Sequence, residues 1–230
     1  MFAAASLTQA LEQIGKGFES QHPGVHLTFN FAGSQALRTQ IEQGAPADVF
    51  AAASSVDMDA VVTAGYADPS AVQPFVTNRL EVILPPGNPA GLSKLQDLAR
   101  PGLKLVLAAP DVPVGKYSRQ ALDQMDSAFG AGFAESVLGN VVSEEDNVKQ
   151  VVAKVQLGEA DAGIVYVSDA IAAPDLKTIE IPPQLNVTAQ YVIAALKGAH
   201  DASLAISFVE YARSPDARSI FAKWGFGPLP

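Results

Sequence analysis

The hydrophobic positions of this chain follow two alternating spacings. Between Leu7 and Phe18 they recur at intervals of four, three and four residues, which is the apolar stripe of an amphipathic helix. Between Val25 and Phe31 every second residue is apolar, as in a strand with one buried face. The same two patterns follow one another as far as the C-terminus, so the chain is expected to alternate between strands and helices.

The elements predicted in this way cover most of the sequence. Helical segments are expected at Leu7–Phe18, Ser34–Gln43, Val56–Ala64, Leu92–Leu98, Tyr117–Met125, Phe129–Leu138, Val148–Leu157, Ala202–Tyr211 and Ala217–Trp224. Strands are expected at Phe2–Ala5, Val25–Phe31, Val49–Ala53, Leu80–Leu84, Leu103–Ala108, Val141–Val142, Ala162–Val167, Lys177–Ile181 and Tyr191–Leu196. Such alternation is typical of the α/β class with mostly parallel sheets.

Candidate domain linkers are short. The Pro- and Gly-rich stretches at Pro85–Gly91 and Pro182–Pro183 are not long enough to act as flexible linkers. If the chain forms two domains, we expect it to cross between them along strands, near Arg79 and again near Asn186. One domain is then discontinuous and built from both ends of the chain.

Composition excludes several classes of function. Of 230 residues, 48% are hydrophobic and 17% are charged, and 15 Lys and Arg against 24 Asp and Glu give a net charge of −9. The cations are scattered singly, which argues against a nucleic-acid or anionic-membrane partner.

Cysteine is absent, which excludes disulfides, thiolate nucleophiles and cysteine-ligated metals. No apolar run approaches the roughly 20 residues that span a bilayer, and no basic leader is visible before the first strand, so we expect a processed chain.

A strand followed by a small polar turn that opens a helix occurs four times, at Ala5–Ser6, Ala32–Ser34, Val112–Gly115 and Glu145–Val148. The first backbone N–H groups of a helix have no partner within it and carry partial positive charge, so each turn is a candidate anion site. The alternative is that the two serines only cap their helices, and Gln9 indeed lies three residues after Ser6, in the capping-box pattern.

Four further side chains are candidates for the same kind of site. Tyr166 lies near the end of a predicted strand and its phenol can donate a hydrogen bond; the alternative is a half-buried aromatic ring with a solvated hydroxyl. Arg38, Lys116 and Lys149 lie within about the first turn of predicted anion-binding helices. Their alternative role is that of solvated surface cations.

Enzyme chemistry is not favoured by the sequence. His22 and His26 are separated by Pro23–Gly24, which interrupts any helix that could place both on one face, and His200 lies at a polar helix start. Neither a nucleophile elbow, a zinc-binding H-E-x-x-H nor a phosphate-binding glycine loop is present. The acidic run Glu144–Asp146 is typical of a solvated surface.

Several segments are similar, in the same order, to those of the molybdate-binding proteins of bacterial ABC importers. They are Phe2–Thr8, Phe31–Ser34, Gln40–Phe50, Val112–Tyr117, Glu145–Val148, Gly163–Ala170 and Trp224–Phe226, of which Gly44–Phe50 is the most specific. The resemblance implies a type II periplasmic-binding-protein fold, with two α/β lobes of mixed sheets joined by a two-strand hinge and an oxyanion held in the cleft. Residues 1–78 and 189–230 form one lobe in this interpretation, and residues 79–188 form the other.

The resemblance also implies the ligand-binding residues. They are Ser6 and Ser34 in the first lobe and Val114, Val148 and Tyr166 in the second. The serines and the tyrosine would donate through hydroxyls, and the valines through backbone N–H groups; Ala5, Ala53 and Asn147 are neighbouring positions. The sequence departs from a common family form in having Val114 instead of Ala and an additional Asn147, which leaves open which residue of the Glu145–Val148 loop contacts the ligand.

The implied function is capture of molybdate, and equally tungstate, for delivery to the membrane permease of an ABC importer. The implied protein is a periplasmic or extracytoplasmic monomer that is not an enzyme, with no cofactor and no direct protein–metal ligand. The alternatives are a binding protein of the same fold for sulfate or another oxyanion, a ferric-ion binder, an α/β phosphoester hydrolase or transferase, and the sensing part of a regulator. Neutral donors are expected to reject hydrogen phosphate, whose proton needs an acceptor, while sulfate must be rejected by its smaller size.

Overall fold

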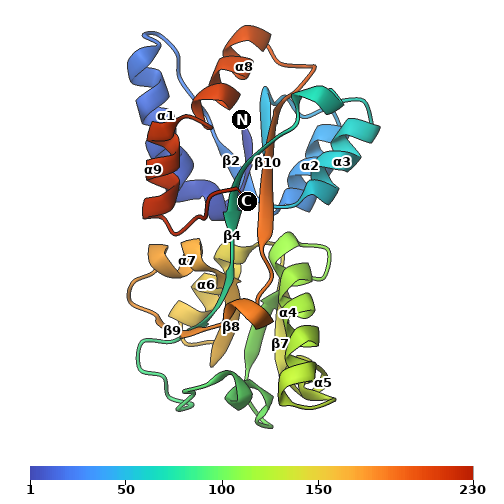
Figure 1. Ribbon diagram of the computed structural model, residues 1–230, viewed down its shortest axis with the longest axis vertical. Coiled ribbons are helices and arrows are strands. Elements are labelled where there is room, and N and C mark those ends of the chain that lie inside the picture. Colours follow the sequence, from blue (N-terminus) through green and yellow to red (C-terminus); the bar gives the residue numbers. More distant parts are fainter. Residues whose placement is uncertain (230) are drawn as a thin grey trace. The chain divides into compact units, whose positions relative to one another are not determined.

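Two five-stranded sheets with helices on both faces build the fold in the computed structural model, which describes residues 1–229 (Figure 1). The chain divides into two units. Unit 1 comprises Met1–Asn78 and the C-terminal segment that begins at Ala189, and unit 2 comprises Arg79–Thr188. Within residues 1–229, no helix combines the length and the apolar composition needed to cross a bilayer.

The sheet of unit 1 has the strand order β2-β1-β3-β10-β4. Its strands are β1 (Phe2–Ala4), β2 (Asn30–Ala32), β3 (Val49–Ala52), β4 (Gln73–Asn78) and β10 (Ala189–Ala195). Strand β1 is parallel to β2 and β3, whereas β10 is antiparallel to both β3 and β4. The helical segments are η1 (Ala5–Leu7), α1 (Thr8–Gln21), α2 (Ser34–Glu42), α3 (Ser55–Thr63), η2 (Pro69–Ala71), α8 (Ala202–Tyr211) and α9 (Pro215–Lys223).

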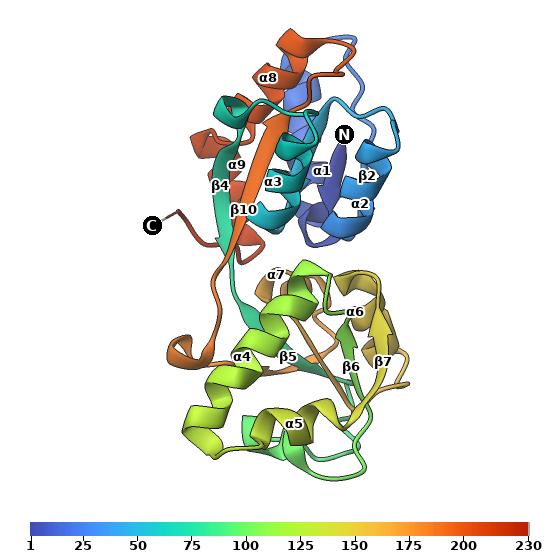
Figure 2. The ribbon, with the colours of Figure 1, turned by 90° about the vertical axis from the view of Figure 1, so that its right-hand side faces the viewer.

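Successive residues of these strands point to opposite faces, and each face has its own helices (Figure 2). Phe50 and Ala52 belong to a buried cluster that packs against α2 and α3. The other face is covered by α1, α8 and α9, where the rings of Phe18 and Phe208 meet edge to face at 5.3 Å between centroids. Strands β1 and β3 are therefore buried on both sides.

The sheet of unit 2 repeats this arrangement with the order β7-β6-β8-β5-β9. Its strands are β5 (Leu80–Leu84), β6 (Leu105–Ala108), β7 (Val141–Glu145), β8 (Ala162–Tyr166) and β9 (Lys177–Glu180). Strand β6 is parallel to β7 and β8, and β5 is antiparallel to β8 and β9. The helical segments are η3 (Leu95–Ala99), α4 (Pro113–Phe129), α5 (Phe133–Leu138), α6 (Val148–Gln156), α7 (Val167–Ala172) and η4 (Pro183–Leu185).

The predicted α/β class and the mixed sheets implied by the resemblance are confirmed. Parallel pairs predominate at one side of each sheet, and a strand from elsewhere in the chain is inserted antiparallel at the other. Sequence periodicity alone indicated only the parallel part, because it carries no information on strand direction.

Some predicted boundaries are wrong. The strand expected at 25–31 is reduced to β2, because β1 offers ladder partners only to Asn30–Ala32. The helix expected from residue 117 begins at Pro113, a residue whose missing N–H is tolerated in a first turn. The helix expected at 129–138 is interrupted between α4 and α5, where Gly130 and Gly132 have φ of 107° and 88°.

Other elements differ in type or were missed. The helical segment expected at 92–98 is the 3-10 helix η3. Strand β4 and helix α7 were not predicted at all. Helix α7 has only six residues, and β4 does not show the alternation of apolar and polar residues that marks a strand.

Candidate functional site

Ser34 joins the ends of two strands in unit 1. It is the first residue of α2, directly after the turn that follows β2, and its side chain is buried. Its Oγ accepts a hydrogen bond of 3.0 Å from the backbone N–H of Ala53, which follows β3. Gly33 occupies the N-cap position of α2, so the interpretation of Ser34 as a helix cap is wrong. Because an N–H can only donate, the hydroxyl proton of Ser34 is left for another acceptor.

Ser6 lies in the 3-10 turn η1 that follows β1, and it too is buried. The expected capping box with Gln9 is wrong, because η1 delays the start of α1 to Thr8. The Ser6 Oγ lies 2.8 Å from the hydroxyl oxygen of Tyr191 on β10. Ala5, the neighbouring candidate, is also buried in η1.

These residues gather at one edge of the sheet. Ser6 follows β1, Ser34 follows β2 and Ala53 follows β3, and the three strands are parallel. The carboxyl ends of parallel strands lie at the same edge, where open α/β sheets bind their ligands. We refer to Ser6 and Ser34, with Ala5 and Ala53 beside them, as the unit 1 half-site.

In unit 2, the start of α4 presents backbone donors. Its first helical hydrogen bond runs from the N–H of Lys116 to the carbonyl of Val112 at 2.9 Å, so the N–H groups of Val114 and Gly115 have no acceptor within the helix. The Val114 side chain is buried in the core. A Cβ at Gly115 would overlap the carbonyl oxygens of Ala108 and Ala109, so glycine allows this turn to approach the end of β6.

The start of α6 shows what Asn147 does in the fold. Asn147 is the N-cap residue, and its Oδ1 accepts hydrogen bonds from the N–H groups of Lys149 at 3.0 Å and Gln150 at 3.2 Å. The cap thus uses the second and third N–H groups of the helix. It does not use the first N–H group of the helix, that of Val148.

Tyr166 is the last residue of β8 and precedes α7. It is buried to 2% exposure, so the alternative of a half-buried ring with a solvated hydroxyl is wrong. Strands β6, β7 and β8 are parallel, and Val114, Val148 and Tyr166 lie after or at their carboxyl ends. These three residues form the unit 2 half-site, which repeats the placement seen in unit 1.

The cations predicted to flank these helices are mostly paired. Lys149 Nζ lies 3.0 Å from Oδ1 of the buried Asp169, and Arg38 lies 3.4 Å from Asp57 and 3.8 Å from Glu42. Their interpretation as solvated surface cations is therefore wrong, whereas Lys116 is exposed as that interpretation expected. Burial raises the pKa of the Asp169 carboxyl, although the ion pair with Lys149 opposes the change.

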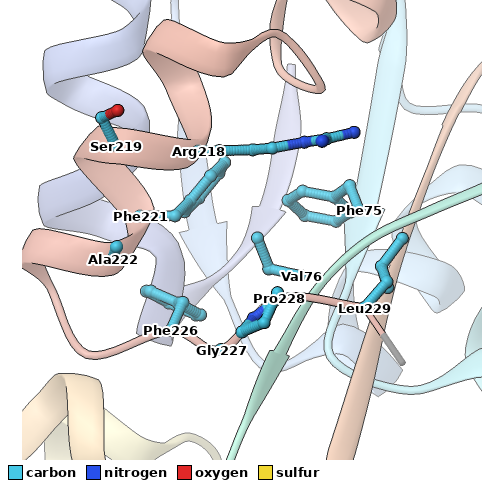
Figure 3. A pocket seen from close by; sticks show the side chains of 10 residues that line it. All are labelled: Phe75, Val76, Arg218, Ser219, Phe221, Ala222, Phe226, Gly227, Pro228 and Leu229. Atoms are coloured by element: carbon cyan, nitrogen blue, oxygen red, sulfur yellow. The ribbon is translucent and has the colours of Figure 1, made fainter.

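Two cavities of unit 1 lie elsewhere. One, of about 460 Å³, has largely apolar walls, and of the described residues that line it only Arg218 is charged (Figure 3). The other cavity, of about 230 Å³, is lined among others by His26, Asp48 and His200. The backbone N–H of His200 donates a hydrogen bond of 2.7 Å to Oδ1 of Asp48. Among residues 1–229, no three His, Cys, Asp or Glu side chains are grouped to hold a metal ion. Neither cavity includes a residue of the half-sites.

Comparison with known proteins identifies the family. Residues 1–227 match the family of bacterial extracellular solute-binding proteins. The chain belongs to this family. A relative from Mycobacterium tuberculosis, the molybdate-binding protein ModA, is 40% identical over 227 residues, which are 98% of this chain and 83% of the relative. Members of the family bind solutes and are not enzymes, in agreement with the expectation from the sequence.

Solved structures show the same fold for this solute-binding protein. The substrate binding domain of a putative molybdenum ABC transporter from Clostridium difficile has a TM-score of 0.73 at 28% identity, covering 100% of this chain and 97% of that one. The sulfate-binding protein SubI from M. tuberculosis has a TM-score of 0.86 at 20% identity, covering 99% and 85%. The second likeness shows the fold alone.

Sequence reasoning did not single out Tyr191, which contacts the unit 1 half-site, or Asp169, which pairs with Lys149 next to Val148. Tyr191 reaches Ser6 from a position 185 residues away along the chain. Asp169 reaches Lys149 from the first turn of α7. Asp169 lies within the Gly163–Ala170 segment of the resemblance, but neither this segment nor any other motif indicates its contact or that of Tyr191, because both contacts join separate segments of the chain. The part that the half-site residues play in ligand binding stays a prediction.

Proposed function

We propose that this solute-binding protein captures molybdate and delivers it to the membrane permease subunits of an ABC importer. The observation that carries the proposal is the pair of half-sites, each at the carboxyl edge of three parallel strands and each offering neutral donors. The 40% identical relative is named a molybdate-binding protein, which supports the choice of anion.

The donors proposed for molybdate are all uncharged. Ser6, Ser34 and Tyr166 donate through hydroxyls, and Val114 and Val148 through backbone N–H groups. A hydrogen bond to a charged group is worth about 1.5–3 kcal/mol, so five such bonds outweigh the entropy lost on association.

Neutral donors also determine which anions are accepted. A hydrogen phosphate ion has a proton of its own, for which a carboxylate is the strong acceptor, and this set of donors includes no carboxylate. Tungstate matches molybdate in charge and size and is expected to bind comparably. Sulfate is the second candidate, because the protein shares its fold with the sulfate-binding protein SubI; its shorter bonds leave contacts in a molybdate-sized site stretched.

The test is calorimetric titration of the purified chain with sodium molybdate, tungstate, sulfate, phosphate and chromate at one ionic strength. We expect molybdate and tungstate to bind with similar affinity, at least about 100-fold more tightly than sulfate, which corresponds to about 2.7 kcal/mol. Sulfate binding as tight as molybdate binding would reject the assignment of the ligand.

We further propose that the protein acts as a monomer in the periplasm or an equivalent extracytoplasmic space. The family is one of extracellular solute-binding proteins, which supports this location. Light scattering of the protein as it elutes from a size-exclusion column is expected to give the mass of one chain, both with and without molybdate.

A further inference from the structure

The hydroxyl of Ser6 is already engaged by Tyr191, and this contact bears on how Ser6 can meet an anion. The two oxygens are 2.8 Å apart, and both side chains are buried. Either oxygen can be the donor in this pair. The direction of the hydrogen bond decides whether the Ser6 proton points toward Tyr191 or toward a ligand.

The Tyr191 hydroxyl is held in a fixed place by its ring. The ring makes near-perpendicular edge contacts with Phe75, at 6.4 Å and 88°, and with Phe226, at 5.5 Å and 87°. The ladder between β10 and β4 also shifts register between Tyr191 and Val192. A ring packed in this way is held in one rotamer, so its hydroxyl stays directed at Ser6.

Ser34 shows what this geometry achieves in the same half-site. Its Oγ accepts a hydrogen bond from the N–H of Ala53, a group that can only donate, so its own proton is left to point elsewhere. A phenol is a stronger acid than an alkyl hydroxyl and is therefore the better donor in a Tyr–Ser pair. The Tyr191 hydroxyl can thus donate a hydrogen bond to Ser6 Oγ, as the backbone N–H of Ala53 does to Ser34 Oγ.

We propose that Tyr191 is a positioning residue: it donates its phenol proton to Ser6 Oγ, so that the Ser6 hydroxyl is left as a donor to the bound oxyanion. The inference rests on the proposed function. Both serines then accept a hydrogen bond from a buried donor and direct their own protons elsewhere, which suits a fully deprotonated anion. Hydrogen bonds in series also polarise one another, which strengthens the Ser6 bond to the anion.

The test is a double-mutant cycle on molybdate affinity, measured by calorimetry. Tyr191→Phe removes one oxygen and leaves the ring, and we expect it to weaken binding about three- to tenfold. Ser6→Ala is expected to weaken binding about 10- to 100-fold. If Tyr191 acts through Ser6, adding Tyr191→Phe to Ser6→Ala changes the affinity less than about twofold.

A matched control is Tyr66→Phe, which removes a phenol that donates to the Glu42 carbonyl at 3.0 Å in the same unit. We expect it to leave the affinity unchanged. Equal losses from Tyr191→Phe in the presence and absence of Ser6 would overturn the inference, because they would show a general structural effect. The inference would also be overturned if Tyr191→Phe bound molybdate as tightly as the parent protein while Ser6→Ala bound it weakly. The proposed function would stand in that case. Failure of the unsubstituted protein to bind molybdate would overturn both.

A second measurement needs no change at Tyr191. A buried phenol proton that donates to Ser6 exchanges slowly with water and can be followed by NMR. Addition of molybdate is expected to shift its resonance in the parent protein and to leave it unshifted in Ser6→Ala. A proton that shifts equally in both proteins would contradict the proposed direction of the hydrogen bond.

Discussion

Each hydroxyl of the unit 1 half-site has a buried partner, and this detail lies beyond sequence reasoning. Ser6 and Ser34 are the first polar residues after their strands, and the sequence left two interpretations open, an anion site or a helix cap. The structure instead pairs Ser6 with Tyr191 and Ser34 with the N–H of Ala53. Position along the chain placed both serines at helix starts, but only the folded sheet determines what their hydroxyls contact.

The residue that tests the neutral-donor site most directly is Ser34. We expect Ser34→Ala to weaken molybdate binding about 10- to 100-fold, because one hydrogen bond to a charged group is lost. The Ala53 N–H also loses its acceptor, which is expected to lower the free energy of unfolding by about 1–3 kcal/mol without unfolding the protein. Calorimetry and urea denaturation measure the two effects.

Lys116→Ala is the matched control, since this exposed cation lies in the first turn of α4. With neutral donors the change in affinity is expected to stay within about threefold, as for a solvent-screened charge. A collapse of molybdate binding in this variant would show that a formal cation, and not a set of dipoles, holds the anion.

The buried Asp169 gives unit 2 a characteristic dependence on pH. Burial raises the pKa of its carboxyl above the ordinary value of 3.8. Between 3.8 and the raised pKa, the unfolded chain has released this proton while the folded chain retains it, so stability falls as pH rises through that window. Asp169→Asn removes the group, and its stability relative to the parent protein is therefore expected to increase with pH there.

Urea denaturation of both proteins at intervals from about pH 3 to pH 7 checks this prediction, since that range spans the ordinary carboxyl values. The comparison between parent and variant cancels the other carboxyls that titrate in the same range. A relative stability of Asp169→Asn that decreases with rising pH would show that the ion pair with Lys149, and not burial, dominates the titration of Asp169.

At the level of elements, predictions succeeded where the signal is local. Helix α6 was predicted at Val148–Leu157 and is found at Val148–Gln156, because an apolar stripe and a capping residue mark it. Strand β4 was missed because Pro74 interrupts its pattern, although proline is tolerated on an edge strand, and β4 lies at the edge of its sheet. Helix α7 has six residues, too few to show a helical period.

The cap of α6 offers a test at this scale. Asn147→Ala removes the acceptor for the N–H groups of Lys149 and Gln150, and we expect the free energy of unfolding to fall by about 1 kcal/mol. The first turn also loses the cap that aims the Val148 N–H, so molybdate binding is expected to weaken about three- to tenfold.

Ser214→Ala is a suitable comparison. Ser214 caps α9 by accepting a hydrogen bond of 3.2 Å from the backbone N–H of Ala217, and α9 contributes no residue to either half-site. A similar loss of stability with unchanged molybdate affinity is expected. Equal affinities for the two cap variants would show that the α6 terminus does not contribute to binding.

For the whole molecule, the sequence allowed the fold class, the family and the non-enzymatic role to be predicted. The sequence could not predict that β10 and β5 run antiparallel to β3 and β8, because the pattern of apolar residues in a strand is the same for either strand direction. The pairing of β10 with β3 joins residues about 140 positions apart, and no local pattern encodes a contact at such a distance. The resemblance to a known family supplied what periodicity could not.

The overall charge of −9 leads to a prediction about rates. An acidic protein repels an incoming dianion, and salt screens this repulsion. Raising the sodium chloride concentration from about 10 mM to about 150 mM is therefore expected to speed the association of molybdate, because the screening length shortens from about 30 Å to about 8 Å. Stopped-flow fluorescence measures the rate; slower association at higher salt would indicate attraction by unpaired cations.

The position of β10 has a consequence for the order in which the protein acquires its structure. Unit 2 is one uninterrupted stretch, Arg79–Thr188, whereas the sheet of unit 1 needs a central strand that is synthesised only after it. The N-terminal segment must therefore wait, with β3 and β4 lacking the neighbour between them, until the rest of the chain has emerged. Such distant pairing is slow to form and exposes strand edges in the meantime, so during biogenesis the first residues made are among the last to become native.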